Sequence, residues 1–400
     1  MKLKLKTLFK DSIWTISGLM LMNVVAQFIV YPAWNRQLGN DGYGNILYLL
    51  SLMNIIAISV GSASNYTRIT ESRNGRNSSS TYLLILLCCT ALIAPATMII
   101  KGISNISMSP TEWVLFGCLT ALTMWRFYAD VEYKLTLNYK GYFLYYLFIS
   151  IGYGIGIYLS FVTNLWPLAL IPGEIMGLIW VFLKGKSLRW DAPLSKPDVR
   201  AALKVFGTLV AADVISHMIF NGDRLLLKTL LDGEAVTMYY LASLISKTIS
   251  LVTTPMNSII IGYLVRMELK FTRKFMHGVS LISLALTLLA TGACIIGSWI
   301  LIPVLYPAEY DLVSGYFWIA SLTQAFYFIG NMITVVLLRF CSSRYQLYIN
   351  TAYAVAFLVF CPAATIFYGF NGFCAGLLAT SILRWATALV LGYKNTTKSA

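Results

Sequence analysis

About twelve long apolar stretches follow one another along this chain, from near Ile13 to near Gly392. A helix needs about 20 residues to cross the roughly 30 Å of hydrocarbon in a bilayer, and stretches of that length recur here with short polar gaps between them. The chain is 58% hydrophobic and only 12% charged, whereas soluble proteins are about 45–50% apolar and about 25% charged. The sequence therefore predicts an all-α membrane protein. The predicted spans are 13–34, 44–66, 81–100, 112–130, 142–162, 165–183, 204–222, 236–263, 279–303, 313–337, 348–368 and 372–393.

The basic residues predict how these spans are oriented. Of the 30 Lys and Arg residues, 23 lie in every second gap between spans. Loops that stay in the cytoplasm are enriched in Lys and Arg, so topology accounts for the net charge of +14 and no nucleic-acid partner is expected. Both termini are predicted to be cytoplasmic, which requires an even number of spans. The opposite side holds Arg36, Lys101, Arg224 and Lys228, and the spans themselves hold Arg126, Lys247 and Arg384.

Several features argue against an enzyme. The longest gap on the outer side, 102–111, has about ten residues, which leaves no room for the large catalytic loop of a membrane glycan polymerase. There is no phosphate-binding loop motif, and glycines spaced as Gly152, Gly154 and Gly156 inside a span are typical of close helix packing or a kink. All seven cysteines lie in or at the ends of apolar spans, so neither disulfides, nor a metal, nor any cofactor is expected.

A weak internal repeat divides the chain into two halves. At an offset of 192 residues, the sequence Tyr-Leu-Leu-Ser at 48–51 falls on Tyr-Leu-Ala-Ser at 240–243, and Arg36 falls on Lys228. The offset superimposes the first span on the seventh, as expected for a transporter built from two fused halves. We therefore expect a six-helix bundle in 1–190, a basic cytoplasmic linker in 191–203 and a second six-helix bundle in 204–400.

Polar side chains are costly inside a membrane, so they are candidates for function. They recur at helical spacing in the first two spans of each half. Small hydroxyl residues can simply mediate helix packing, and we accept that explanation for most of the serines. It does not account for Asp213, Lys247 or Arg384, for which a polar cavity is the better explanation. The four sets are Asn23, Gln27 and Tyr31; Ser51, Asn54, Ser62 and Asn65; Asp213, His217 and Asn221; and Ser243, Lys247, Ser250, Thr254 and Asn257.

Two short motifs carry a family resemblance. The sequence Arg-Gln-Leu-Gly at 36–39, followed by Gly-Tyr-Gly at 42–44, resembles a turn in bacterial oligosaccharide-lipid flippases of the polysaccharide transporter family. Asp223-Arg224, followed by Tyr239-Tyr240, resembles that family's signature in the second half. The resemblance implies the fold of the multidrug, oligosaccharidyl-lipid and polysaccharide exporter superfamily, with two six-helix bundles in a V and spans one, two, seven and eight around a central cavity.

The resemblance also implies what is transported. The substrate would be an undecaprenyl-diphosphate-linked oligosaccharide, an O-antigen, lipopolysaccharide or capsule repeat unit, moved from the cytoplasmic to the outer leaflet of the bacterial inner membrane by alternating access. The implied partners are this substrate, membrane lipids and other membrane proteins of glycan assembly.

Moving a diphosphate requires fixed cations, and arginine forks suit phosphate geometry. The predicted substrate-binding residues are Arg36, Arg224, Lys228, Lys247, Arg384, Asn23 and Gln27. Arg36 and Lys228 can equally be anchors that reach the lipid head groups. Asp213 and His217, one helical turn apart, form a candidate proton relay for ion coupling, although Asp213 could instead neutralise Lys247.

Two other functions remain open from the sequence. A cation-coupled multidrug exporter shares the superfamily fold, but the cations in the expected cavity favour an anionic substrate. A membrane glycan polymerase is disfavoured because the chain has no large outer loop.

Overall fold

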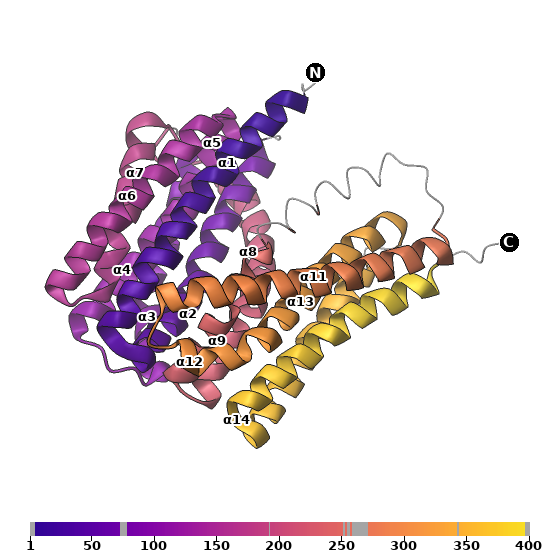
Figure 1. The fold of residues 1–400 in the computed structure, drawn as a ribbon. Helices are drawn as coiled ribbons and strands as arrows, with labels where there is room; N and C mark the ends of the chain where they lie inside the picture. The colour runs from indigo at the N-terminus through magenta and orange to yellow at the C-terminus, as the bar shows by residue number, and fades with distance from the viewer. Residues whose placement is uncertain are drawn as a thin grey trace. The chain divides into compact units, whose positions relative to one another are not determined.

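The computed structural model describes residues 5–72, 78–191, 193–250, 253, 257, 271–341 and 344–396. These residues are almost entirely helical, and Figure 1 shows long helices as the main elements. The chain forms two compact units, and the boundary between them lies between Gly222 and Asp223, inside helix α8. The linker predicted for 191–203 lies before this division, so the six-plus-six domain boundaries stay a prediction.

The first unit contains the helices up to the middle of α8. They are α1 (Leu5–Val25), η1 (Ala26–Val30), α2 (Tyr31–Ser72), α3 (Ser79–Ser104), α4 (Pro110–Ala129), α5 (Val131–Thr136), α6 (Tyr139–Thr163), η2 (Trp166–Ala169), α7 (Ile171–Lys184) and α8 (Lys196–Leu230). The second unit contains the end of α8 and the helices that follow. They are α9 (Gly233–Lys247), α11 (Arg273–Leu305), α12 (Tyr310–Val313), η3 (Ser314–Tyr316), α13 (Phe317–Phe340) and α14 (Arg344–Lys394).

Two glycines divide the longest helical stretches at sharp bends. Gly39 in α2 has φ 69° and Gly369 in α14 has φ 58°, a left-handed conformation that glycine adopts without a steric penalty. Each bend lies in a predicted gap, between 34 and 44 and between 368 and 372. Divided in this way, the helices correspond to all twelve predicted spans within the described residues, although the eighth span is described continuously only to residue 250.

Among the residues that the structure describes, seven helical stretches are long and apolar enough to cross a membrane, and two of them are the glycine-divided ones. They extend over Ile13–Ser72, Ser79–Ser104, Tyr139–Thr163, Lys196–Leu230, Arg273–Leu305, Tyr310–Leu338 and Arg344–Lys394. This is the all-α architecture of a multi-pass membrane protein, as the sequence predicts.

Within the first unit, α6 packs closely against its neighbours because it carries glycines. A Cβ on Gly152 would lie 2.4 Å from the Cα of Gly173 on α7, and a Cβ on Gly156 would lie 2.3 Å from the carbonyl oxygen of Ala169. The packing role predicted for these two glycines is confirmed. Gly154 faces open space, so the packing alternative is wrong for this glycine.

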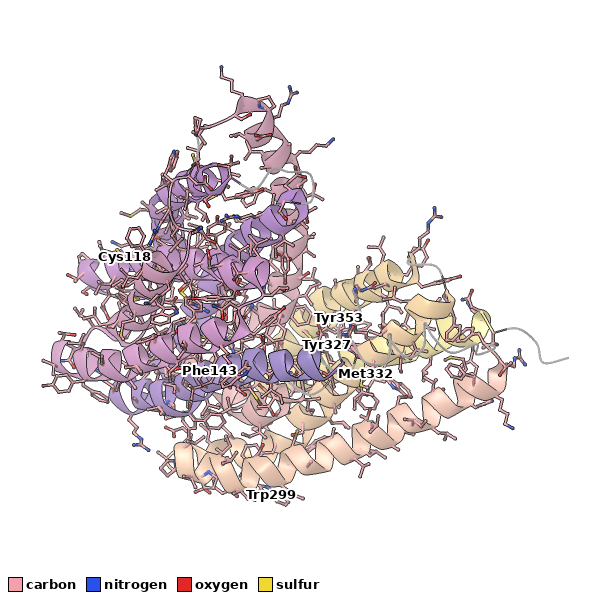
Figure 2. The ribbon with its side chains drawn as sticks, turned by 90° about the horizontal axis from the view of Figure 1, so that it is seen from above. Cys118, Phe143, Trp299, Tyr327, Met332 and Tyr353 are labelled. Carbon is pink, nitrogen blue, oxygen red and sulfur yellow. The ribbon has the colours of Figure 1, made fainter. Side chains whose placement is uncertain are left out.

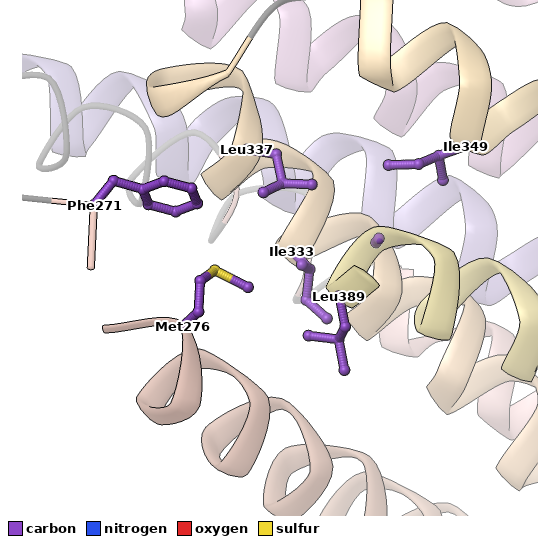
Figure 3. Close-up of a cluster of buried hydrophobic side chains, with 7 residues drawn as sticks. Phe271, Met276, Ile333, Leu337, Ile349 and Leu389 are labelled. Carbon is purple, nitrogen blue, oxygen red and sulfur yellow. The ribbon is translucent and has the colours of Figure 1, made fainter. Parts of the chain in front are cut away.

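Within the second unit, α13 packs against α11, α9 and both halves of α14. One apolar cluster lies at the end of α13 near Phe340, where the stacked rings of Phe271 and Phe340 have centroids 4.8 Å apart. Figure 3 shows this cluster, in which side chains from α11, α13 and both halves of α14 converge. Its buried members are Phe271, Met276, Ile333, Leu337, Ile349, Ala388 and Leu389.

Candidate functional site

A charged cluster joins the end of α8 to α9 in the second unit. The Nζ of Lys247 lies 2.5 Å from Oδ2 of Asp223, and the two side chains are only 16% and 8% exposed. The backbone N–H of Arg224 donates to the other carboxylate oxygen of Asp223 at 2.9 Å. The Arg224 guanidinium lies over the ring of Tyr240, 5.1 Å from its centroid. We call Asp223, Arg224 and Lys247 the cationic cluster, because its two cations and one carboxylate leave a net positive charge.

Local sequence explains how the chain turns between these residues. Helix α8 ends at Leu230, and the Asp232 side chain accepts a hydrogen bond of 2.8 Å from the N–H of Ala235 in the first turn of α9. Aspartate is a favoured N-cap because it satisfies an otherwise unbonded amide. The short turn returns the chain as α9, and Lys247 at its end reaches Asp223.

This ion pair corrects one alternative drawn from the sequence. Lys247 pairs with Asp223 rather than with Asp213. Asp213 and His217 are both half-buried, one turn apart on α8 as predicted, and Asn221 donates to the carbonyl oxygen of His217 at 2.9 Å. The proton relay therefore stays a prediction, without the competing explanation that Asp213 neutralises Lys247.

Arg384 lies in a neutral polar setting between α13 and both halves of α14. Its side chain donates to the carbonyl oxygen of Tyr327 at 2.9 Å and to the side-chain oxygens of Asn331 and Asn350 at 3.2 Å each. The guanidinium lies 4.4 Å from the ring centroid of Tyr327 and 5.6 Å from that of Tyr353, and Figure 2 shows these two tyrosines together. Within the described residues, no carboxylate forms an ion pair with Arg384.

The predicted residues of the first span lie near an irregular part of the helix. Gln27 is half-buried in the π-helical segment η1, a distortion often found at functional sites. Asn23 donates to the carbonyl oxygen of Leu19 in its own helix at 2.9 Å. Arg36 is exposed just before the bend at Gly39, and Lys228 is half-buried in the last turn of α8.

Two of the predicted hydroxyl residues are buried within their helices. Ser51 and Ser243 are fully buried and donate to carbonyl oxygens of their own helices, Leu47 at 2.8 Å and Tyr240 at 3.3 Å. The packing explanation stays the prediction for these two serines. Thr254 lies outside the described residues.

One buried ion pair was missed in the sequence. Nε of Arg126 on α4 lies 2.7 Å from Oε2 of Glu174 on α7, and both side chains are at least nine-tenths buried. Tyr153 on α6 donates to Glu174 at 2.8 Å. The sequence indicates such a pair, because both residues lie inside predicted spans and charged residues there usually pair with one another. The three side chains connect three helices of the first unit.

No group of His, Cys, Asp or Glu side chains that could hold a metal ion occurs in the part of the chain that the structure describes. No protein-family model matches the sequence, and no curated protein matches it.

Solved structures share the fold over nearly the whole chain. A lipid II flippase, MurJ, in its inward closed conformation has a TM-score of 0.72 at 12% identity, over 97% of this chain and 88% of that chain. An inward-facing multidrug resistance transporter of the MATE family, in the MOP superfamily, has a TM-score of 0.70 at 10% identity, over 95% and 97%. A MOP superfamily transporter from Pyrococcus furiosus has a TM-score of 0.64 at 12% identity, over 96% and 93%.

These similarities define the fold as that of MOP superfamily transporters. The proteins that share it are transporters and flippases rather than enzymes. The all-α superfamily fold that the motif resemblance implies is therefore confirmed, whereas the V-shaped arrangement and its central cavity stay predictions. Identities this low do not select one family within the superfamily.

Proposed function

We propose that this protein is a flippase that moves an undecaprenyl-diphosphate-linked oligosaccharide from the cytoplasmic to the outer leaflet of the bacterial inner membrane. The observation that carries the proposal is the cationic cluster, which places two cations against one carboxylate in a membrane transporter fold. A net positive charge at low dielectric favours an anionic ligand over a cationic drug. The similarity to a lipid II flippase supports a lipid-linked substrate.

The geometry of the cluster suggests how a diphosphate is bound. The carboxylate of Asp223 holds the Lys247 ammonium. An incoming phosphate oxygen can replace that carboxylate, while the guanidinium of Arg224 adds a planar pair of donors that suits phosphate. Binding would then break the link between the end of α8 and the end of α9, which couples substrate binding to movement of these two helices.

The other predicted residues have supporting roles in this proposal. Asn23 and Gln27 offer amide groups to sugar hydroxyls. Arg36 and Lys228, at helix ends predicted to face outward, attract the head group as it leaves. The terminal nitrogens of Arg384 already donate to neutral oxygens on α13 and α14. In this proposal the residue therefore connects the two helices and contributes positive potential, and it does not bind the substrate directly.

A cation-coupled multidrug exporter is the second candidate, because Asp213 and His217 provide titratable groups on a span and several similar structures are multidrug transporters. The two candidates differ in substrate charge. A drug exporter would lower the accumulation of a lipophilic cationic dye in cells, whereas the flippase would not.

A genetic experiment tests the flippase. Deleting the gene from its host should stop surface display of one glycan and cause its lipid-linked precursor to accumulate, as measured by mass spectrometry of extracted lipids. The wild-type gene and the Lys101→Gln variant, changed at an exposed position of α3, should restore display, and the Lys247→Gln variant should not. Normal glycan display after deletion, with new sensitivity to cationic drugs, would identify the exporter instead.

A further inference from the structure

A cavity of about 550 Å³ opens in the second unit, and no residue of the cationic cluster lines it. It lies where α12, η3 and the start of α13 meet the second half of α14. Its volume is within the roughly 300–1,000 Å³ typical of small-molecule sites. The charge distribution predicts that this end of the bundle faces outward, since the opposite end of α13 adjoins the basic residues Arg339 and Arg344.

Aromatic side chains line this cavity in fixed positions. The Tyr316 ring lies edge-on to Phe370, with centroids 4.8 Å apart, and its hydroxyl donates to Oδ1 of Asn371 at 2.8 Å. These two contacts hold Tyr316 across the gap between η3 and α14. Trp318, which also lines the cavity, is 55% exposed. An indole that stays exposed in this way presents an apolar face to a ligand.

Polar groups complete the lining. Asp311 offers a carboxylate, and no hydrogen bond or ion pair to that carboxylate occurs within the described residues. Asn371 accepts from Tyr316 with its oxygen, which leaves its amide nitrogen to donate. Gly315 adds open space, because a Cβ there would meet nothing within 4 Å.

This combination matches the surface of a sugar ring. A pyranose has an apolar C–H face that packs on an indole and a rim of hydroxyls that donate to carboxylates and accept from amides. None of the lining residues is basic, so a phosphate or an acidic sugar would meet only the negative charge of Asp311. The site therefore differs in charge from the cationic cluster.

We propose that this cavity is a carbohydrate site that takes a neutral hexose or N-acetylhexosamine unit of the transported glycan at the outer face. The assignment to a transported glycan rests on the proposed flippase function. Asp311 and Asn371 bind the hydroxyls, and Trp318 supports the ring. Such a site would retain the saccharide after its diphosphate has left the cationic cluster, and so disfavour its return.

Direct binding tests the site independently of transport. The full chain in detergent micelles is mixed with methyl glycosides of glucose, galactose, mannose and N-acetylglucosamine, and saturation-transfer NMR detects ring protons that contact the protein. We expect a signal from at least one of these sugars. It should disappear in Trp318→Ala and in Gly315→Trp, which fills the cavity.

The matched control is Trp299→Ala. Trp299 on α11 (Figure 2) has the same exposed fraction of 55% as Trp318 and does not line the cavity. This variant should keep the signal. Absence of a signal from every sugar, or equal loss in the Trp318 and Trp299 variants, would overturn the assignment even if glycan export is established. A sugar signal that is lost in Trp318→Ala and kept in Trp299→Ala, together with normal glycan display after gene deletion, would instead refute the flippase function and still support the sugar site.

Discussion

At the scale of single residues, the ion pair of Lys247 and Asp223 determines whether the cluster is ready for an anion. Removing one member of a buried pair leaves the other charge uncompensated, which costs about 3 kcal/mol, whereas removing both is close to neutral. We expect Lys247→Gln to lower the free energy of unfolding by that amount and Asp223→Asn/Lys247→Gln to recover most of it. Thermal unfolding in detergent measures both.

Glycan export should not recover in the double variant, although its stability does. Both variants lack the ammonium that binds phosphate, so both should fail to export glycan, while Lys101→Gln behaves as wild type. Export restored in the double variant would show that Lys247 has only a structural role.

Asp213 and His217 provide the test of coupling. We expect Asp213→Asn to abolish the response of transport to an imposed pH gradient in reconstituted vesicles, because the carboxyl group is the proposed proton carrier. Ser216→Ala, at an exposed position of the same helix, should keep the response. Full gradient-driven activity of Asp213→Asn would remove this residue from the mechanism.

The sequence identified single charged residues better than it identified their partners. Lys247 and Arg384 are conspicuous as charges inside apolar spans. Asp223 lies 24 residues from Lys247 and Glu174 lies 48 residues from Arg126, so no helical periodicity connects either pair. Only the packing of helices brings them together.

At the scale of elements, the loop after α7 is attached to the first unit through Asp191. Its carboxylate accepts from the N–H groups of Ser79 and Ser80 at 2.8 and 3.2 Å, at the start of α3, and from the hydroxyls of Ser78 and Ser80. Partial burial tends to raise the pKa of Asp191, but these hydrogen bonds outweigh it and lower the pKa to about 2. The contact fixes the chain shortly before α8 begins.

This contact makes a prediction about pH. A carboxylate with a lowered pKa stabilises the folded state above its unfolded pKa, and that stabilisation is lost as pH falls through the folded pKa. The protection of the Ser79 and Ser80 amides from hydrogen exchange should therefore persist at neutral pH and weaken only between about pH 4 and about pH 2. Asp191→Asn should lower this protection at every pH above about 4, where the wild-type carboxylate is charged. Loss that begins above about pH 5 would contradict the assignment.

The elements themselves were largely predictable, since hydropathy located the spans and the glycine bends fall in predicted gaps. The irregular details were not. The π-helical segment that holds Gln27 has no signature in the local sequence, because its extra residue per turn depends on how the surrounding helices pack.

At the scale of the whole molecule, the charge distribution predicts which ends of the helices face the cytoplasm. In a Cys-free background, single cysteines at Ser107, Ala308 and Asn371 should react with a membrane-impermeant thiol reagent in intact cells. Cysteines at Arg189 and Arg344 should react only in inverted vesicles, and so should cysteines at Arg73 and Lys270, which lie outside the described residues. Reaction of position 107 only in inverted vesicles would overturn the predicted number of spans.

The all-α multi-pass architecture was predictable from the apolar spans and the alternating charge pattern. The superfamily fold was expected only from the motif resemblance. Substrate chemistry was less accessible, because the same fold serves flippases and multidrug exporters. The proposal of a flippase therefore rests on the charges of the cationic cluster rather than on the fold.

The central claim is that the chain translocates a lipid-linked anionic saccharide. The rate at which such a lipid crosses a membrane tests this claim most directly. The purified chain is reconstituted into vesicles with a fluorescent undecaprenyl-diphosphate saccharide, and a quencher outside the vesicles reports the fraction in the outer leaflet. We predict rapid equilibration between leaflets with the wild type and with Lys101→Gln, and none with Lys247→Gln or empty vesicles. Equal rates in vesicles with and without the wild-type protein would contradict the account.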